Sequence, residues 1–307
     1  MTKKLKIIFM GTPEFAVTSL EALKDRTEIL AVITQPDRPR GRGKKVLPSS
    51  VKTWAIENKI EVLQPEKIKT EEFTNQLADL NPDLIVVVAF GQILSQKILD
   101  LPKFGCVNVH ASLLPKYRGA APIEWSIING ETKTGVTTMM MNAGLDTGDM
   151  LVRREVEISE NMILPELREK LQIAGADALI ETIDRIVDGS LTRQVQDDSL
   201  SSYAPMLTKE TGLIDWNKSA REIHNLIRGL YGGAYTIIDG QKFKIWKSRI
   251  NSECRMQNAE LIQNDKLFVN TGDGVIEILE IQAPNSKKLS TADFLRGHKD
   301  FKIIGND

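Results

Sequence analysis

Short apolar runs alternate with amphipathic segments along the first half of the chain. Each run is short enough to be a strand and apolar enough to be covered on both faces. Such strands are predicted at 5–10, 29–33, 83–89, 106–110, 135–141 and 151–158. Helical spacing of apolar residues predicts helices between and after them, at 51–58, 71–80, 123–129 and 164–187. Strands and helices in alternation indicate an α/β domain with a doubly wound, mostly parallel, Rossmann-like sheet.

The pattern changes after residue 208. A short strand at 212–216 and a helix capped by Ser219 are followed by short alternating segments separated by turns. These segments lie at 234–238, 241–247, 259–262, 266–269 and 274–282. They predict a small antiparallel β-barrel, OB-like in size.

Residues 190–208 are polar without a clear period, which is typical of a linker. We therefore predict a catalytic domain at 1–189, a linker at 190–208 and a barrel domain at 209–307.

Composition narrows the class of protein. The 307 residues carry a net charge of −1, so any contact with nucleic acid must come from a local basic patch. Cys106 and Cys254 are the only cysteines and lie far apart, which argues against a disulfide framework. No apolar run reaches the length of a membrane span. We expect a cytoplasmic monomer without a membrane partner.

The strand at 106–110 carries the first candidate chemistry. Asn108 and His110 are two residues apart, so both side chains lie on one face of the strand. An amide there can donate to a developing oxyanion, and an imidazole can move a proton. A buried structural histidine is the alternative for His110. Ser112 has no activating group beyond His110, so a nucleophilic serine is the weaker interpretation.

A second loop supplies a carboxylate. Asp146 lies between Gly144 and Gly148, and such glycines allow a backbone to approach a ligand closely. An aspartate in a loop is more often only a turn former. A metal site is not expected, because the chain has three histidines and two of them lie beyond residue 208. Asn108, His110 and Asp146 together suit acyl transfer by direct attack, with Asp146 orienting His110.

Two further loops near the N-terminus bear on phosphate binding. In the first, Gly11 ends a strand, Thr12 suits an N-cap and Pro13 the first helical position, but no GxGxxG follows. The second is rich in basic residues, with only Asp37 as an acid: Arg38, Arg40, Arg42, Lys44 and Lys45. It is either a solvated loop or a mobile loop that contacts phosphates, and it lacks P-loop spacing.

Four stretches together resemble the methionyl-tRNA formyltransferase family, over nearly the whole chain: MGTPEFAV, TQPDRPRGRGKK, VNVHASLLPKYRGAAPI and GVTTMMMNAGLDTGDM. The resemblance implies formyl transfer from 10-formyltetrahydrofolate to methionine on initiator tRNA. It makes Asn108, His110 and Asp146 the catalytic positions. The implied folate-binding residues are Ser112, Leu113, Leu114 and Pro115, with Phe90, Gly91 and Ile93 lining the pterin pocket. The basic loop would engage the acceptor end of the tRNA, and the barrel would hold its body.

Other functions remain open at this stage. A formyltransferase acting on an amino sugar, or a formyltetrahydrofolate hydrolase, would keep the three polar residues but not need the basic loop. A non-catalytic RNA-binding protein would need the loop alone, and this chain carries both features. One element departs from the family, since 230–235 replaces a Pro-Trp-Pro-like stretch. Gly232 and Gly233 are expected to loosen the barrel there.

Overall fold

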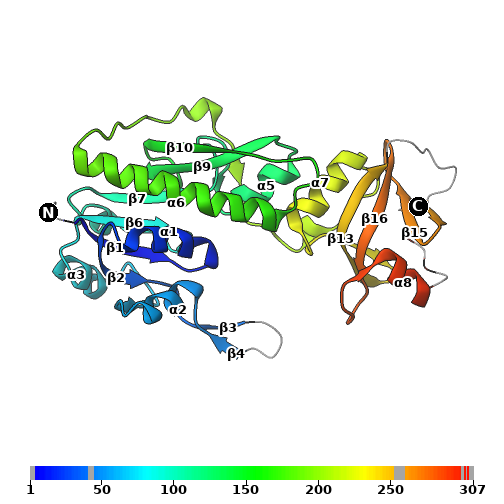
Figure 1. Ribbon diagram of the computed structural model, residues 1–307, viewed down its shortest axis with the longest axis horizontal. Coiled ribbons are helices and arrows are strands. Elements are labelled where there is room, and N and C mark those ends of the chain that lie inside the picture. Colours follow the sequence, from blue (N-terminus) through cyan, green and yellow to red (C-terminus); the bar gives the residue numbers. More distant parts are fainter. Residues whose placement is uncertain (1–3, 41–44, 252–259, 299–300, 302, 304–307) are drawn as a thin grey trace. The chain divides into compact units, whose positions relative to one another are not determined.

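The computed structural model describes residues 4–40, 45–251, 260–298, 301 and 303 (Figure 1). The chain divides into two compact units, and neither is continuous in sequence. The first contains residues 1–119, 135–156 and 168–203, and the second contains 120–134, 157–167 and 204–307. These units do not coincide with the predicted domains. Residues 190–203 of the predicted linker group with the first unit, and residues 120–134 and 157–167 of the predicted catalytic domain group with the second.

The first unit is built on a seven-stranded sheet with the order β10-β9-β7-β6-β1-β2-β5. Its strands are β1 (Lys6–Gly11), β2 (Glu28–Ile33), β5 (Val62–Leu63), β6 (Leu84–Val88), β7 (Cys106–His110), β9 (Lys133–Met140) and β10 (Met150–Glu157). Strands β5, β2, β1, β6 and β7 pair in parallel, and β9 joins β7 antiparallel. The mostly parallel, Rossmann-like sheet is confirmed.

Helices cover this sheet (Figure 1). Every residue of β6 is buried, as its apolar run predicts. The helices are α1 (Glu14–Lys24), α2 (Ser50–Glu57), α3 (Glu71–Asp79), α4 (Gln96–Leu99) and α6 (Leu164–Asp188). In one layer of the core, Ile85 and Val87 pack with Phe73 and Leu77 of α3. Thr12 does not cap α1, because its hydroxyl donates to the carbonyl of Phe90 at 3.1 Å.

Two small sheets complete the described strands of the first half. A hairpin pairs β3 (Arg38–Arg40) with β4 (Lys45–Leu47), and β8 (Arg118–Gly119) pairs with β11 (Tyr203–Ala204). A short 3-10 helix, η1 (Asp198–Leu200), precedes β11. The pairing of β11 with β8 explains why the predicted linker is not a free connection.

The second unit contains the antiparallel β domain expected of the C-terminal half, and its sheet order is β12-β13-β16-β15-β14, with β17 on β16. The strands are β12 (Tyr235–Ile238), β13 (Gln241–Asn251), β14 (Glu260–Gln263), β15 (Lys266–Asn270), β16 (Val275–Gln282) and β17 (Leu289–Ser290). The helices are α5 (Pro122–Ile128), α7 (Ala220–Leu230) and α8 (Thr291–Gly297). Ser219 caps α7 as predicted.

Two local expectations in this unit are wrong. The predicted strand at 212–216 is instead the end of a 3-10 helix, η2 (Glu210–Gly212), followed by a single bridge from Leu213 to Tyr235. The glycine pair does not loosen the packing, because a Cβ on Gly232 would lie 2.5 Å from the ring of Trp246. Gly232 has a φ of +84°, so it combines a left-handed turn with close contact to β13.

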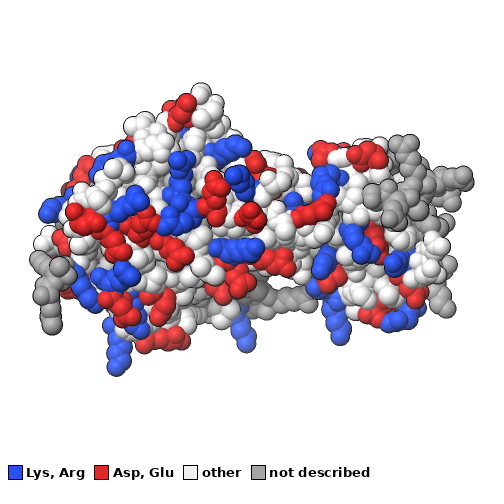
Figure 2. All heavy atoms as spheres, turned by 45° about the horizontal axis from the view of Figure 1, so that its top comes forward, with Lys and Arg blue, Asp and Glu red and all other residues white. Residues whose placement is uncertain are grey.

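Two further observations concern the charges on the surface and the character of the helices. Acidic and basic side chains are interspersed over the face shown in Figure 2. Among the described residues, no helix combines the length and the apolar character needed to cross a membrane.

Candidate active site

The candidate site begins at the end of β7, in the interior of the sheet. In the register of the sheet, Asn108 pairs with Val87 of β6 and Met139 of β9, and His110 pairs with Thr137. The carboxyl ends of parallel strands are where ligands bind in open α/β sheets. His110 is the last residue of β7 and therefore lies at the carboxyl ends of the parallel strands, where ligands bind in this class of fold.

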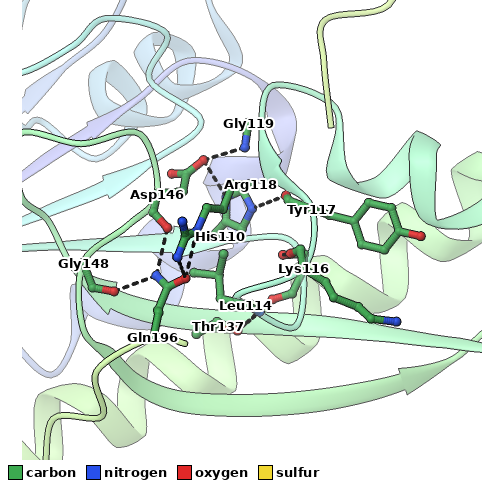
Figure 3. A network of polar contacts seen from close by, with 11 residues as sticks. His110, Leu114, Lys116, Tyr117, Arg118, Gly119, Thr137, Asp146, Gly148 and Gln196 are labelled. Carbon is green, nitrogen blue, oxygen red and sulfur yellow. Dashed lines mark hydrogen bonds and ion pairs between the residues drawn. The ribbon is translucent and has the colours of Figure 1, made fainter. Parts of the chain in front are cut away.

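His110 is fixed through one of its two ring nitrogens (Figure 3). Its Nε2 lies 2.8 Å from the backbone carbonyl oxygen of Tyr117, and the side chain is only 6% exposed. A carbonyl accepts but cannot donate, so Nε2 carries the proton of the neutral imidazole. This leaves the lone pair on Nδ1, which is the nitrogen that can take up a proton.

Asp146 faces that nitrogen. Its Oδ2 lies 3.6 Å from Nδ1 of His110 and accepts a hydrogen bond of 2.8 Å from the backbone N–H of Gly119. The structure thus brings together His110 and Asp146, which are 36 positions apart in the sequence. If Nδ1 takes up a proton, the carboxylate is placed to stabilise the resulting imidazolium.

The loop that carries Asp146 is closely packed. Asp146 itself has a φ of +53°, in the left-handed region. A Cβ on Gly148 would lie 1.7 Å from the carbonyl oxygen of Met140, so only glycine fits there. The flanking glycine therefore serves the packing of the loop against β9, and this fixes where the carboxylate points.

Asn108 lies two residues before His110 on the same strand and is half-buried. Its side chain forms no hydrogen bond within the part of the chain that the structure describes, where every buried polar side-chain atom has a partner. Its amide is therefore open to a ligand, as a donor to an oxyanion would have to be.

The predicted folate segment forms a fixed turn. Thr137 donates to the carbonyl of Ser112 at 2.7 Å and accepts from the backbone N–H of Leu114 at 3.1 Å. The peptide bond between Leu114 and Pro115 is cis, and Ser112 donates to the carbonyl of Lys116 at 2.6 Å. Ser112 and Leu114 are buried, so Leu113 and Pro115, which are half-buried, are the members of the segment open to a ligand.

The three expected pterin contacts behave differently from one another. Phe90 is 2% exposed and packs in the hydrophobic core with Leu94 and Ile98. Gly91 is exposed with a φ of +86°, and Ile93 is 66% exposed. A ligand at this position could therefore contact Ile93 and the backbone of Gly91, while the side chain of Phe90 supports the core.

The basic loop is part of a hairpin. Arg38 and Arg40 belong to β3 and Lys45 to β4, whereas Arg42 and Lys44 fall outside the described residues. The side chains of Arg38 and Lys45 are exposed. The neighbouring acid, Asp37, accepts a hydrogen bond from Lys52 of α2 at 2.5 Å. The charge of Asp37 is therefore partly neutralised by Lys52 rather than by the basic residues of the hairpin.

Two side chains near the site carry no signal in the sequence. Gln196 is 7% exposed although it lies in the polar predicted linker, and it contacts both Arg118 and the loop of Asp146. These contacts depend on segments distant in the chain, so neither spacing nor composition could have found them.

Within the described part of the chain, no group of three or more metal-ligating side chains occurs.

Comparison with known proteins identifies the family. The formyl transferase family model matches residues 3–183, and the model of the formyl transferase C-terminal domain matches residues 206–299. A methionyl-tRNA formyltransferase from Ruminiclostridium cellulolyticum is 52% identical over 96% of this chain and 97% of its own length. A methionyl-tRNA formyltransferase from Geobacter metallireducens is 52% identical over 95% of this chain and 96% of its own length. The chain belongs to the methionyl-tRNA formyltransferase family.

The fold of the family extends to solved structures of other formyltransferases. A sugar 3N-formyl transferase, WlaRD, matches with a TM-score of 0.68 at 24% identity, over 92% of this chain and 99% of that one. At that identity the likeness concerns the fold. Membership of the methionyl-tRNA formyltransferase family rests on the full-length relatives.

Proposed function

We propose that the chain transfers the formyl group of 10-formyltetrahydrofolate to the α-amino group of methionine on initiator tRNA. The product, N-formylmethionyl-tRNA, would serve translation initiation in the cytoplasm. The observation that carries the proposal is the 52% identity, over nearly the full chain, to enzymes named for this reaction. A folate donor is also supported by WlaRD, whose structure was solved in the presence of 5-N-formyl-THF.

The attacking amine needs little activation. A free α-amino group has a pKa of roughly 7.7–8.0, so an appreciable fraction is neutral and nucleophilic near neutral pH. Its lone pair would attack the formyl carbon, and the formyl oxygen would become an oxyanion. The protein then has to hold the two reactants together, stabilise the oxyanion and move one proton.

Asn108 is the proposed oxyanion donor. Its amide is open to a ligand and lies on the strand that carries His110. A donor of this kind typically contributes on the order of 3 kcal/mol to the transition state. The contribution is large because the donor is held in place before charge develops on the oxygen.

His110 and Asp146 are the proposed proton-transfer pair. Because Nε2 is held by the carbonyl of Tyr117, Nδ1 is the atom that would take the proton of the attacking amine. The same nitrogen would return the proton to N10 of the folate as the bond from the formyl carbon to N10 breaks. Asp146 at 3.6 Å would stabilise the imidazolium between the two steps.

Substrate recognition is assigned to three other elements. We expect residues 112–115 to contact the folate, with Ile93 and Gly91 nearby. The basic hairpin, including Arg42 and Lys44, would contact phosphates of the acceptor end. The antiparallel domain would hold the body of the tRNA, and one copy of the chain would suffice.

The test is a direct assay of product. The protein is mixed with 10-formyltetrahydrofolate and methionylated initiator tRNA, and the tRNA is deacylated and analysed for formylmethionine. Formation of formylmethionine supports the proposal. Its absence would refute it, and formate or a formylated amino sugar in parallel reactions would identify the hydrolase or sugar alternative.

A further inference from the structure

We infer that Gln196 is a positioning residue that holds His110 and Asp146 in register by tying together the two loops that orient them. The inference builds on the proposed proton-transfer pair. It concerns a side chain that lies outside the catalytic strand, in a stretch whose sequence predicts only a linker. All the groups involved lie in the first compact unit.

The carboxamide of Gln196 holds the loop of Asp146 by its nitrogen. Nε2 donates to the carbonyl oxygen of Asp146 at 2.8 Å and to that of Gly148 at 2.7 Å (Figure 3). The two N–H groups of one amide are thus both used, on either side of Thr147. Since Gln196 is 7% exposed, water does not readily replace these bonds.

The oxygen of the same carboxamide holds the other loop. Oε1 accepts from both Nε and Nη2 of Arg118, at 3.0 and 2.8 Å. Arg118 is flanked by Tyr117, whose carbonyl accepts from His110, and by Gly119, whose N–H donates to Asp146. Each neighbour of Arg118 therefore contacts one member of the pair directly.

These bonds form a closed connection around the pair. Gln196 joins Arg118 to the backbone of the Asp146 loop, and Tyr117 and Gly119 join the same loop segment to the two side chains. A shift of either loop would change the separation of Nδ1 and Oδ2, which is now 3.6 Å. Small displacements of reacting or orienting groups are costly, with losses of about a hundredfold for about 1 Å.

Nothing in this arrangement requires Gln196 to touch a substrate. Its amide nitrogen and oxygen are both engaged by protein groups, so it is saturated before any substrate binds. The loss of Gln196 should therefore lower kcat and leave substrate binding largely unchanged.

The test compares Gln196→Met with Gln194→Met in steady-state formylation. Met removes the amide at similar length, and Gln194 lies two residues away with an exposed bond to Arg153. For Gln196→Met we expect kcat to fall about 10- to 100-fold, while the KM values for methionyl-tRNA and folate change less than about threefold. Gln194→Met should resemble the parent. The inference is overturned if kcat of folded Gln196→Met stays within about twofold of the parent.

Two further variants distinguish positioning from general stability. Gln196→Glu can still accept from Arg118 but cannot donate to the two carbonyls, so it should lose kcat as Gln196→Met does. Arg118→Met removes the partner of the Gln196 oxygen. The double variant with Gln196→Met should lower kcat by less than the product of the two single fold-decreases. Multiplicative losses, or a lower melting temperature with an unchanged kcat, would contradict the inference.

The parent enzyme separates this inference from the proposed function. If the parent does not formylate methionyl-tRNA, the proposed function fails, and the same variants are compared on the amine that it does formylate. If the parent is active and Gln196→Met is equally active, only the inference about Gln196 fails.

Discussion

Asp146→Asn tests the electrostatic half of the proposed pair. The substitution removes the negative charge but keeps an oxygen that can accept from the N–H of Gly119, so the loop should keep its shape. An imidazolium at Nδ1 would then lose an attraction across 3.6 Å. With an effective dielectric constant of about 20, that attraction is about 5 kcal/mol. Both side chains are largely buried, 6% and 13% exposed, so solvent screens the pair only in part.

The rate should fall accordingly. A loss of about 5 kcal/mol corresponds to roughly several thousandfold, and partial screening lowers the expected effect to between about 100- and 1,000-fold. The assay is single-turnover formylation with saturating methionyl-tRNA and folate, alongside equilibrium binding of each. Asp149→Asn removes a negative charge from the same loop and serves as the control, and its formylation rate should equal that of the parent. A loss of less than about fivefold in Asp146→Asn would refute the argument.

Three other predictions follow from groups elsewhere in the chain. Burial lowers the pKa of His224 from 6.5 to about 4, so the unfolded chain takes up a proton first as the pH falls from 6.5 toward 4. The free energy of unfolding of the parent should therefore fall as the pH decreases through that window. In chemical unfolding, the decrease between pH 7.5 and pH 5 should be about 2 kcal/mol smaller for His224→Gln than for the parent; equal decreases would contradict this. Burial also raises the pKa of Cys106 to about 12, so in a Cys254→Ser background a thiol reagent at pH 8 should label it only after denaturation, and labelling of the native protein would be contrary evidence. Replacing Arg40 and Arg42 with Gln should raise the KM for tRNA and lower the slope of log affinity against log salt by about 1 per lost phosphate contact; an unchanged slope would return the loop to a solvated role.

Much of the fold could be predicted because its elements are decided locally. The apolar run that became β6 is short and rich in β-branched residues, which favours a strand over a helix, and every residue of that strand is buried. The bounds of β7 coincide with those predicted, since Pro and Gly residues interrupt the chain soon after it. Ser219 was predictable as a cap because Glu222 lies three residues later, and both side chains take part in the capping box.

The errors arise where a residue's partner is distant in the chain. Thr12 has the character of an N-cap, but the carbonyl of Phe90 takes its hydrogen bond. Gly232 looked like a source of flexibility and is instead held against Trp246. In each case a contact across the fold overrides the local preference.

The candidate site shows the same division. Asn108 and His110 could be predicted because a strand places residues i and i+2 on one face. Asp146 was predicted to join them because it lies in a loop between two glycines, but its distance from His110 is given only by the structure. Gln196 was missed because its role depends on hydrogen bonds to two segments that are distant from it in the sequence.

The most direct measurement of the central claim is single-turnover formylation of methionyl-tRNA by His110→Ala at matched occupancy of tRNA. The account predicts that the parent converts the bound tRNA to formylmethionyl-tRNA. The variant should bind the tRNA with an affinity within about threefold of the parent but form essentially no product, because Nδ1 carries the proton in the reaction. Product formation by His110→Ala at a rate near that of the parent would contradict the account.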